Sequence, residues 1–275
     1  MVDRLRFTIL GCGSSPGVPR ITGDWGQCDP ANLKNRRMRA SALVERIRPS
    51  GATTRVVIDT GPDFREQMLL ARVPLIDAVI YTHGHADHIH GIDDLRGFVI
   101  EQRRLMDIHA DAATYRRLRE GFGYCFETPE GSSYPPILKA HLIDHERPVV
   151  IEGEGGALSF LPLPQVHGEI VSLGFRVGDV AYCSDVSHFP DATVPLLSGL
   201  DMLIIDALQY REHVSHFSLR EALDWIERLK PRRALLTHMH VPLDYDTVLR
   251  DTPAHVEPAY DGLSFEVALA EDQPK

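Results

Sequence analysis

Four side chains able to bind a metal ion stand close together at residues 83–88, where the sequence reads HGHADH. Imidazole nitrogens and carboxylate oxygens are ligands of first-row divalent metal ions. His83 and His85 point the same way in extended or turning backbone, and Asp87 and His88 follow one turn later, where they can serve a second ion. A solvated histidine-rich loop is the alternative, but such loops rarely follow a buried strand with ligands this ordered. The spacing therefore predicts a metal site.

The apolar run at residues 77–82 stands directly before these histidines and is predicted to be the buried strand that positions them. The segment 121–145 loses periodicity and carries aromatic residues and prolines, which fits either a substrate-facing lid or a surface loop. Further strands are expected at residues 5–10, 41–47, 55–60, 107–110, 148–152, 158–163, 171–177, 180–184, 202–207, 233–237 and 263–267. Helices are expected at residues 64–72, 112–120 and 218–230, from residue 91 onward and after residue 241.

The pattern His-x-His-x-Asp-His after a strand resembles the signature of the metallo-β-lactamase superfamily. Within it, the chain most resembles the PhnP-type phosphodiesterases of the carbon–phosphorus lyase pathway. The resemblance implies an α/β (α+β) fold, a four-layer αββα sandwich with a dinuclear metal centre at one sheet edge. It also implies further ligands downstream, and three residues occur in the family's order, each closing a short apolar or β-prone run: His167, Asp185 and His238.

The resemblance also implies how the ligands are shared between two ions. One ion would be bound by His83, His85 and His167, the other by Asp87, His88 and His238, with Asp185 bridging the two. Two such ions share a hydroxide, because metal binding lowers the pKa of water to about 7, and Asp87 would also orient that nucleophile. Zinc, manganese and iron(II) all suit this donor set. Asp59 is expected to hydrogen-bond backbone beside the site rather than to bind metal.

Ser218 and Glu221 form a capping-box pattern, which predicts a helix that begins at this point. His216 lies just before that helix, where free backbone amides and the helix dipole attract an anion. It follows Asp185 and precedes His238 in the sequence, as the catalytic histidine does in phosphodiesterase members of the superfamily. We therefore expect His216 to bind a phosphate oxygen or protonate the leaving alkoxide, with Ser218 as a second substrate-binding residue.

The fold alone does not select a reaction, because superfamily members cleave β-lactams, thioesters, lactones, sulfate esters and phosphodiesters. His216 favours phosphodiesters, as does Asp185, which stands where lactamases often carry cysteine. The segments GIDDLR (91–96), HFS (216–218) and HMH (238–240) resemble the PhnP branch, which acts on cyclic ribose phosphates. The prediction is a dinuclear-metal-dependent phosphodiesterase for a small substrate. The alternatives are a tRNA 3′-processing endoribonuclease, a thioester or lactone hydrolase, and a non-enzymatic cofactor-handling or binding protein such as the pyrroloquinoline quinone biosynthesis branch.

Residues 18–39 depart from the PhnP pattern. PhnP enzymes often carry several cysteines here that bind a structural zinc, but this segment holds only Cys28, so no structural zinc is predicted. The cluster Arg36–Arg39 fits either a solvated basic face or an arginine group that binds phosphate. Farther on, His240 has the chemistry of a ligand but the wrong register for the ion of His238, which leaves it a supporting or substrate-binding role.

Composition sets the remaining limits. The chain has 275 residues, 43 % hydrophobic and 25 % charged, with no break in composition, so we expect one domain over residues 1–275 built from two similar halves. A net charge of −10 argues against binding of a long nucleic acid, which normally requires a basic face. No apolar stretch approaches ~20 residues, the first residues lack a signal-peptide core, and the four cysteines are scattered. We therefore expect a cytoplasmic protein without membrane contact; a homodimer would be common on symmetry grounds.

Overall fold

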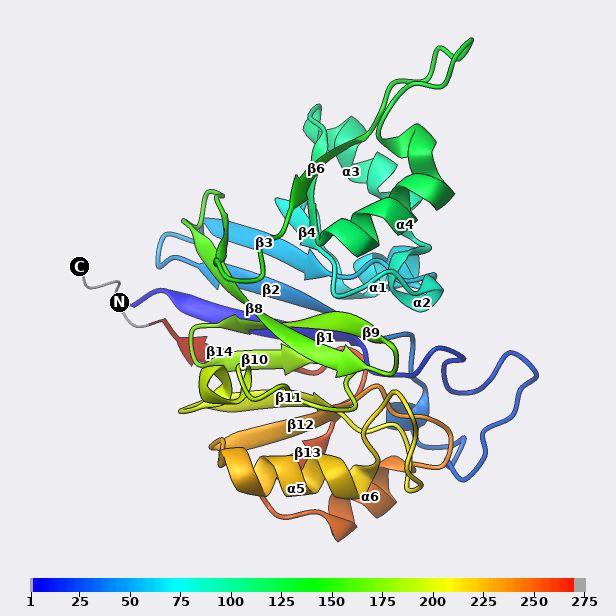
Figure 1. Ribbon diagram of the computed structural model, residues 1–275, viewed down its shortest axis with the longest axis vertical. Helices are drawn as coiled ribbons and strands as arrows, with labels where there is room; N and C mark the ends of the chain where they lie inside the picture. The colour runs from blue at the N-terminus through cyan, green and yellow to red at the C-terminus, as the bar shows by residue number, and fades with distance from the viewer. Residues whose placement is uncertain (1, 270–275) are drawn as a thin grey trace. The chain divides into compact units, whose positions relative to one another are not determined.

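The computed structural model describes residues 2–269, which form two compact units (Figure 1). Unit 1 comprises residues 2–8, 41–159 and 264–269, and unit 2 comprises residues 9–40 and 160–263. Each unit combines a mixed β-sheet with helices. Among the described residues no helix is both long and apolar enough to span a membrane.

The sheet of unit 1 has the strand order β14-β1-β2-β3-β4-β5-β6. Strand β14 is antiparallel to β1, and β2 to β3, whereas β3 to β6 are parallel. Parallel neighbours require crossover connections, and helices α1 to α4 lie in these connections. The elements that lie wholly or mostly in unit 1 are β1 (Arg4–Gly11), β2 (Ser41–Ile47), β3 (Thr53–Ile58), α1 (Phe64–Ala71), β4 (Ala78–Ile80), α2 (Ala86–Ile89), α3 (Leu95–Gln102), β5 (Met106–Ala110), α4 (Ala112–Phe122), β6 (Leu138–Leu142), β7 (Val149–Ile151), which is not a strand of this sheet, and β14 (Ser264–Ala268).

The sheet of unit 2 contains the order β13-β12-β11-β10-β9-β8. Strands β8, β9 and β10 are antiparallel neighbours, and β10 to β13 are parallel, with α5 and α6 in the crossovers. All five residues of β11 are buried, and α5 runs alongside the sheet (Figure 1). The elements are β8 (Leu158–His167), β9 (Ile170–Val177), β10 (Val180–Cys183), β11 (Met202–Asp206), α5 (Leu219–Leu229), β12 (Arg233–Thr237), α6 (Tyr245–Asp251) and β13 (Val256–Pro258).

Most predicted elements are present within one or two residues of their expected bounds, but two strands were missed. Strand β6 lies inside the 121–145 segment that was expected to be irregular, and of its residues only Leu138 is buried. Strand β13 has three residues and ends in a proline, which an edge strand tolerates because it needs fewer ladder hydrogen bonds. Both strands lie at sheet edges, and neither has a clear hydrophobic pattern, because β6 is mostly unburied and β13 is only three residues long.

Candidate metal centre

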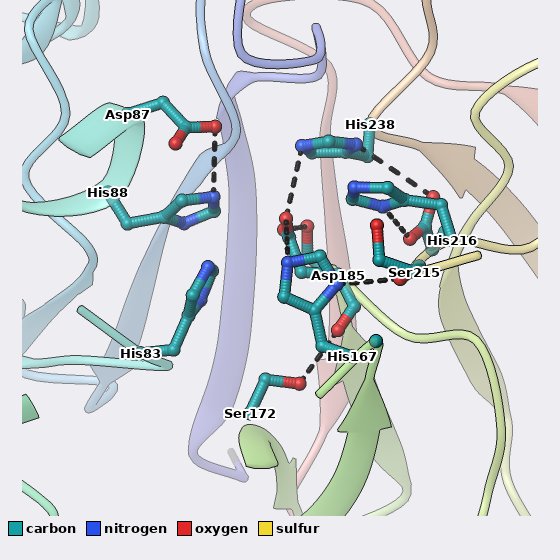
Figure 2. Close-up of polar contacts among 12 residues, drawn as sticks. His83, Asp87, His88, His167, Ser172, Asp185, Ser215, His216 and His238 are labelled. Atoms are coloured by element: carbon teal, nitrogen blue, oxygen red, sulfur yellow. Dashed lines mark hydrogen bonds and ion pairs between the residues drawn. The ribbon is translucent and has the colours of Figure 1, made fainter. Parts of the chain in front are cut away.

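In unit 1, the predicted ligands stand where β4 ends and the one-turn helix α2 begins. Strand β4 is fully buried, which fixes the start of the ligand segment against the core. His83, Asp87 and His88 are buried and His85 is exposed. The ring centroid of His83 lies 4.5 Å from that of His85 and 4.3 Å from that of His88. The structure thus gathers all four unit 1 ligands, three of which are shown in Figure 2.

Asp59 is the hydrogen-bonding centre of this group. It is fully buried directly after β3 and accepts bonds from the Thr82 backbone N–H (2.8 Å), the Thr82 hydroxyl (2.7 Å) and Nδ1 of His88 (2.7 Å). Burial raises the pKa of the Asp59 carboxyl, while His88 and the bonds from Thr82 act in the opposite direction. Asp59 was predicted to hydrogen-bond backbone beside the site rather than to bind metal. The bond from the Thr82 backbone agrees with that prediction, and Asp59 also bonds the predicted ligand His88.

These bonds select the tautomer of two histidines. Because the single hydroxyl proton of Thr82 goes to Asp59, the Thr82 oxygen must accept the 3.0 Å bond from Nδ1 of His83. Nδ1 of His88 likewise donates to Asp59. In the neutral rings, both Nε2 atoms then carry a lone pair, and Nε2 of His88 lies 3.4 Å from a carboxylate oxygen of Asp87. Two lone-pair atoms facing each other at this distance suit a shared cation, so this donor set fits a divalent metal.

Asp59→Asn is expected to weaken metal binding by about 10–100-fold, because an amide cannot accept all three bonds and the His83 and His88 tautomers are no longer fixed. The measurement is titration of metal-free protein with Zn²⁺ in competition with a chelator. Asp144→Asn, at a half-exposed position of the same unit, is the matched control and should bind as the unchanged protein does. Equal affinities of the two variants would show that Asp59 does not support the ligands.

In unit 2, the remaining predicted ligands also stand at strand ends: His167 closes β8, Asp185 follows β10, and His238 follows β12. All three are buried. Nδ1 of His167 donates to the carbonyl of Ser215 (2.6 Å), so Nε2 carries its lone pair. Ser184 donates its hydroxyl to Oδ2 of Asp185 (2.6 Å). The other oxygen, Oδ1, lies 3.2 Å from Nε2 of His238 and 3.8 Å from Nε2 of His167 (Figure 2).

Three of these residues share an unusual backbone conformation. Asp59, Asp185 and His238 have φ angles of +64°, +57° and +56°, in the left-handed region. Residues other than glycine are uncommon in this region. Among them, asparagine, aspartate and histidine adopt it most often. Each residue follows a buried strand, so the left-handed turn directs its side chain at the strand end. Such strain persists only where the surrounding structure over-determines it, and it is concentrated at functional sites.

Asp206, which the sequence analysis did not single out, holds the predicted catalytic histidine. It is fully buried at the end of β11, and its Oδ2 accepts Nδ1 of His216 (2.7 Å) and the backbone N–H of Val186 (3.0 Å). The His216 ring stacks on that of His238 at 4.5 Å and meets His167 edge-on at 4.6 Å. A charged residue closing an apolar strand, as Asp59 does in unit 1, was the available signal. The structure therefore brings His216 together with the unit 2 ligands.

A hollow of about 240 Å³ in unit 2 opens beside His216 and His238, and His240 lines it as well. His240 bonds through Nδ1 to Ser14 (2.7 Å) and through Nε2 to Arg20 (2.6 Å). Burial, and next the charge of Arg20, lowers the pKa of His240 to about 4. His240 is thus neutral and held from both sides, in the supporting or substrate-binding position that the sequence left open.

Ser218 caps α5 as predicted. Its hydroxyl accepts the backbone N–H of Glu221 (3.3 Å) and donates to the Glu221 carboxylate (2.7 Å), and the complete capping box is present. The side chain is buried, at 1 % exposure. The capping contacts occupy both the donor and an acceptor position of this hydroxyl, so the substrate-binding role of Ser218 stays a prediction without a contact in its favour.

Arg37 fits neither interpretation of the Arg36–Arg39 cluster, because its side chain is buried at 1 % exposure. It donates to the carbonyls of Leu243 (2.7 Å) and His240 (3.4 Å), to the Asn35 side chain (3.3 Å) and to the sulfur of Cys28 (3.8 Å). Cys28 itself packs with Val18, Val241 and Trp25. Arg37 and this apolar cluster therefore join residues 18–37 to the segment after His238.

Arg37→Ala is expected to lower the free energy of unfolding by about 3 kcal/mol, because it leaves buried carbonyl groups without donors. Urea denaturation measures this change. Arg36 is exposed, and Arg36→Ala should change the stability by less than about 0.5 kcal/mol. Equal effects of the two substitutions would contradict the structural role of Arg37.

The chain is similar to known proteins in both sequence and structure. The model of the β-lactamase superfamily domain matches residues 54–239. A crystal structure described as a new diphosphatase from the PhnP family is 37 % identical, with a TM-score of 0.86, and the alignment covers 98 % of this chain and 99 % of that one. The Zn²⁺-bound PqqB of Methylobacterium extorquens shares the fold at 15 % identity and a TM-score of 0.69, over 94 % of this chain and 99 % of that one.

A curated protein of Porphyromonas gingivalis (strain ATCC BAA-308 / W83), named octanoyltransferase, is 32 % identical over 264 residues. These residues are 94 % of this chain and 51 % of that protein, so the chain spans about half the length of this relative. The family model and the 37 % identical structure confirm the predicted superfamily and fold class. The chain belongs to the β-lactamase superfamily, in its PhnP-like branch.

Proposed function

We propose that this protein is a metal-dependent hydrolase that cleaves a P–O bond in a small phosphodiester. The observation that carries the proposal is the pair formed by His216 and Asp206 beside the unit 2 ligands. A buried carboxylate on Nδ1 fixes the orientation of the ring and leaves Nε2 as the nitrogen that can exchange a proton with the substrate. Thioester cleavage releases a thiolate, which needs such an acid less than an alkoxide does.

The chain's own residues divide the work as follows. His216 donates a proton from Nε2 to the leaving alkoxide, and Asp206 holds its ring in place. Asp59 and the Ser215 carbonyl orient the imidazoles of His88 and His167. Divalent ions bound by the predicted ligands would supply an activated water and neutralise charge on the phosphoryl oxygens. We propose two ions, with zinc or manganese as the first choices and iron as the third.

A diphosphate is the second candidate substrate, because the 37 % identical structure is described as a diphosphatase. Hydrolysis of a diphosphate breaks the same kind of P–O bond but releases a phosphate rather than an alcohol. A phosphate leaves readily without protonation, whereas an alkoxide does not. The buried His216–Asp206 pair therefore favours the phosphodiester, preferably a cyclic ribose phosphate.

Octanoyl transfer, the activity in the name of the P. gingivalis relative, has no support from the thiols of this chain. Acyl transfer through a cysteine requires a reactive thiolate. Cys12, Cys28, Cys125 and Cys183 are all buried, and burial raises the pKa of each thiol, that of Cys125 to about 11. The relative is about twice as long, and its activity need not belong to the half that resembles this chain.

The test is hydrolysis of bis(p-nitrophenyl) phosphate, a 2′,3′-cyclic nucleotide, a dinucleoside diphosphate, a thioester and a β-lactam by protein of known metal content. Turnover of the two phosphodiesters with little or none of the thioester and lactam is the expected result. Preference for the dinucleoside diphosphate would establish the second candidate. Turnover of none of the three phosphorus substrates with metal bound would refute the proposal. The proposal also includes a small substrate, a cytoplasmic location, a single domain and a homodimer. Each of these requires an experiment of its own.

A further inference from the structure

The unit 2 hollow adjoins the histidine proposed to protonate the leaving group. Its volume of about 240 Å³ is below the roughly 300–1,000 Å³ of pockets for drug-sized ligands, and suits one sugar-sized group. Because His216 stands in its wall, the group that would occupy it is the alcohol whose oxygen receives the proton of His216, whether that alcohol leaves or, in a cyclic ester, stays attached. The lining residues are Ser14, Ser15, Pro16, Leu208, Gln209, His213, His216, His238 and His240.

A chain of hydrogen bonds in the wall fixes the direction of one hydroxyl. Arginine has no acceptor, so in the 2.6 Å contact the guanidinium of Arg20 donates and Nε2 of His240 accepts. Because Nε2 accepts, the ring proton is on Nδ1, and it is donated to the Ser14 oxygen at 2.7 Å. Within residues 2–269 the Ser14 hydroxyl has no further partner, so its own proton is available to a ligand in the hollow.

The backbone around Ser14 is held as firmly. A Cβ at Gly13 would lie 2.9 Å from the carbonyl oxygens of Arg37 and Met38, so only glycine permits this approach. Ser14 is 2 % exposed, and its carbonyl accepts the N–H of Gly17 (2.7 Å). At the other end of this series of hydrogen bonds, Arg20 forms an ion pair with Asp24 at 2.9 Å. Ser14 is therefore a preorganised donor rather than a mobile surface hydroxyl.

We propose that Ser14 determines specificity for an uncharged, hydroxyl-bearing leaving alcohol, to which it donates a hydrogen bond, with His240 and Arg20 as positioning residues. The lining contains no lysine or arginine, and the charge of Arg20 is paired with Asp24, so the hollow has no permanently charged side chain left over for a second phosphate. A site built to bind a hydroxyl discriminates against the analogue that lacks it. This inference rests on the proposed phosphodiesterase function and deepens it.

The test compares symmetric diesters, in which the leaving group is unambiguous: diglyceryl phosphate, di-n-propyl phosphate and bis(p-nitrophenyl) phosphate. The protein should prefer the glyceryl over the propyl ester by about tenfold in kcat/KM, since a hydrogen bond contributes roughly one power of ten. Ser14→Ala should reduce that preference to about twofold, mainly by raising KM for the glyceryl ester. Ser14→Cys keeps a side chain of similar size but is a weak hydrogen-bond donor, so it should lose the preference as Ser14→Ala does. Ser198→Ala, at an exposed serine of unit 2, should retain the full preference.

A double-mutant cycle tests the relay itself. Arg20→Ala should lower the preference about threefold when Ser14 is present and have no effect on it in the Ser14→Ala protein. Equal effects in both backgrounds, or a Ser14→Ala protein that keeps its preference, would overturn the proposal.

Calorimetric binding of the glyceryl and propyl diesters to metal-loaded His216→Ala protein separates this inference from the proposed function. A binding preference that Ser14→Ala removes supports the subsite, even if the unchanged protein hydrolyses no phosphodiester, which would refute only the proposed function. Equal binding of the two diesters, or binding of neither, refutes the subsite.

Discussion

His216→Ala is expected to lower turnover of an alkyl phosphodiester by about 10²–10⁴-fold while metal content stays unchanged. The reason is the geometry of the ring: Asp206 holds Nδ1, so Nε2 is the atom that can deliver a proton. The loss should be much smaller for bis(p-nitrophenyl) phosphate, because p-nitrophenolate departs without protonation. Steady-state kinetics on both esters, with metal analysis of the same samples, measure the difference.

His188→Ala is the matched control for this substitution. His188 follows Asp185 closely in the sequence, but its side chain is exposed and its ring lies against Trp225 instead of the ligands. We expect the turnover of the His188→Ala protein to stay within threefold of that of the unchanged protein. If His216→Ala also stays within threefold on the alkyl ester, or loses both esters equally, the assignment of His216 as the acid is wrong.

The sequence predicted the parts of the fold and site that depend on local pattern. Strand β4, the ligand segment after it and the capped helix α5 each have a strong signature: an apolar run, a fixed spacing of ligand types, and a serine three residues before a glutamate. The edge strands β6 and β13 have none: β6 buries only Leu138, and β13, although two of its residues are buried, is only three residues long. Their pairing is a product of tertiary context.

The supporting residues of the site were harder to predict, because their partners are distant in the sequence. Asp206 and His216 are ten positions apart, and Asp59 and His88 are twenty-nine apart. Arg37 resembles the other members of a basic run, and only the fold shows that it is buried against carbonyls more than two hundred positions away. A histidine's tautomer depends on such contacts. The sequence therefore identified His240 as a side chain able to act at the site but did not determine its role.

Asp185→Ala is expected to reduce the binding of two metal ions at once. By the family resemblance, His167 and His238 serve different ions, and the structure places Oδ1 of Asp185 within 3.8 and 3.2 Å of their respective Nε2 atoms. A carboxylate in this position can neutralise both ions, and Ser184 holds its other oxygen aside. Metal analysis after dialysis should therefore find fewer than one ion per chain, against two for the unchanged protein.

Alanine also strains the left-handed backbone at this position, by about 1 kcal/mol, so a loss of metal through misfolding must be separated from a loss of the ligand. Asp185→Asn tolerates the same φ angle and keeps the shape of the side chain, yet removes the negative charge. It should retain the thermal stability of the metal-free protein and still lose affinity for both ions. If Asp185→Asn loses one ion and keeps the other, Asp185 is a terminal ligand; if both remain, it is not a ligand at all. Only the joint loss agrees with a bridging carboxylate, and with a hydroxide shared between two ions as the nucleophile.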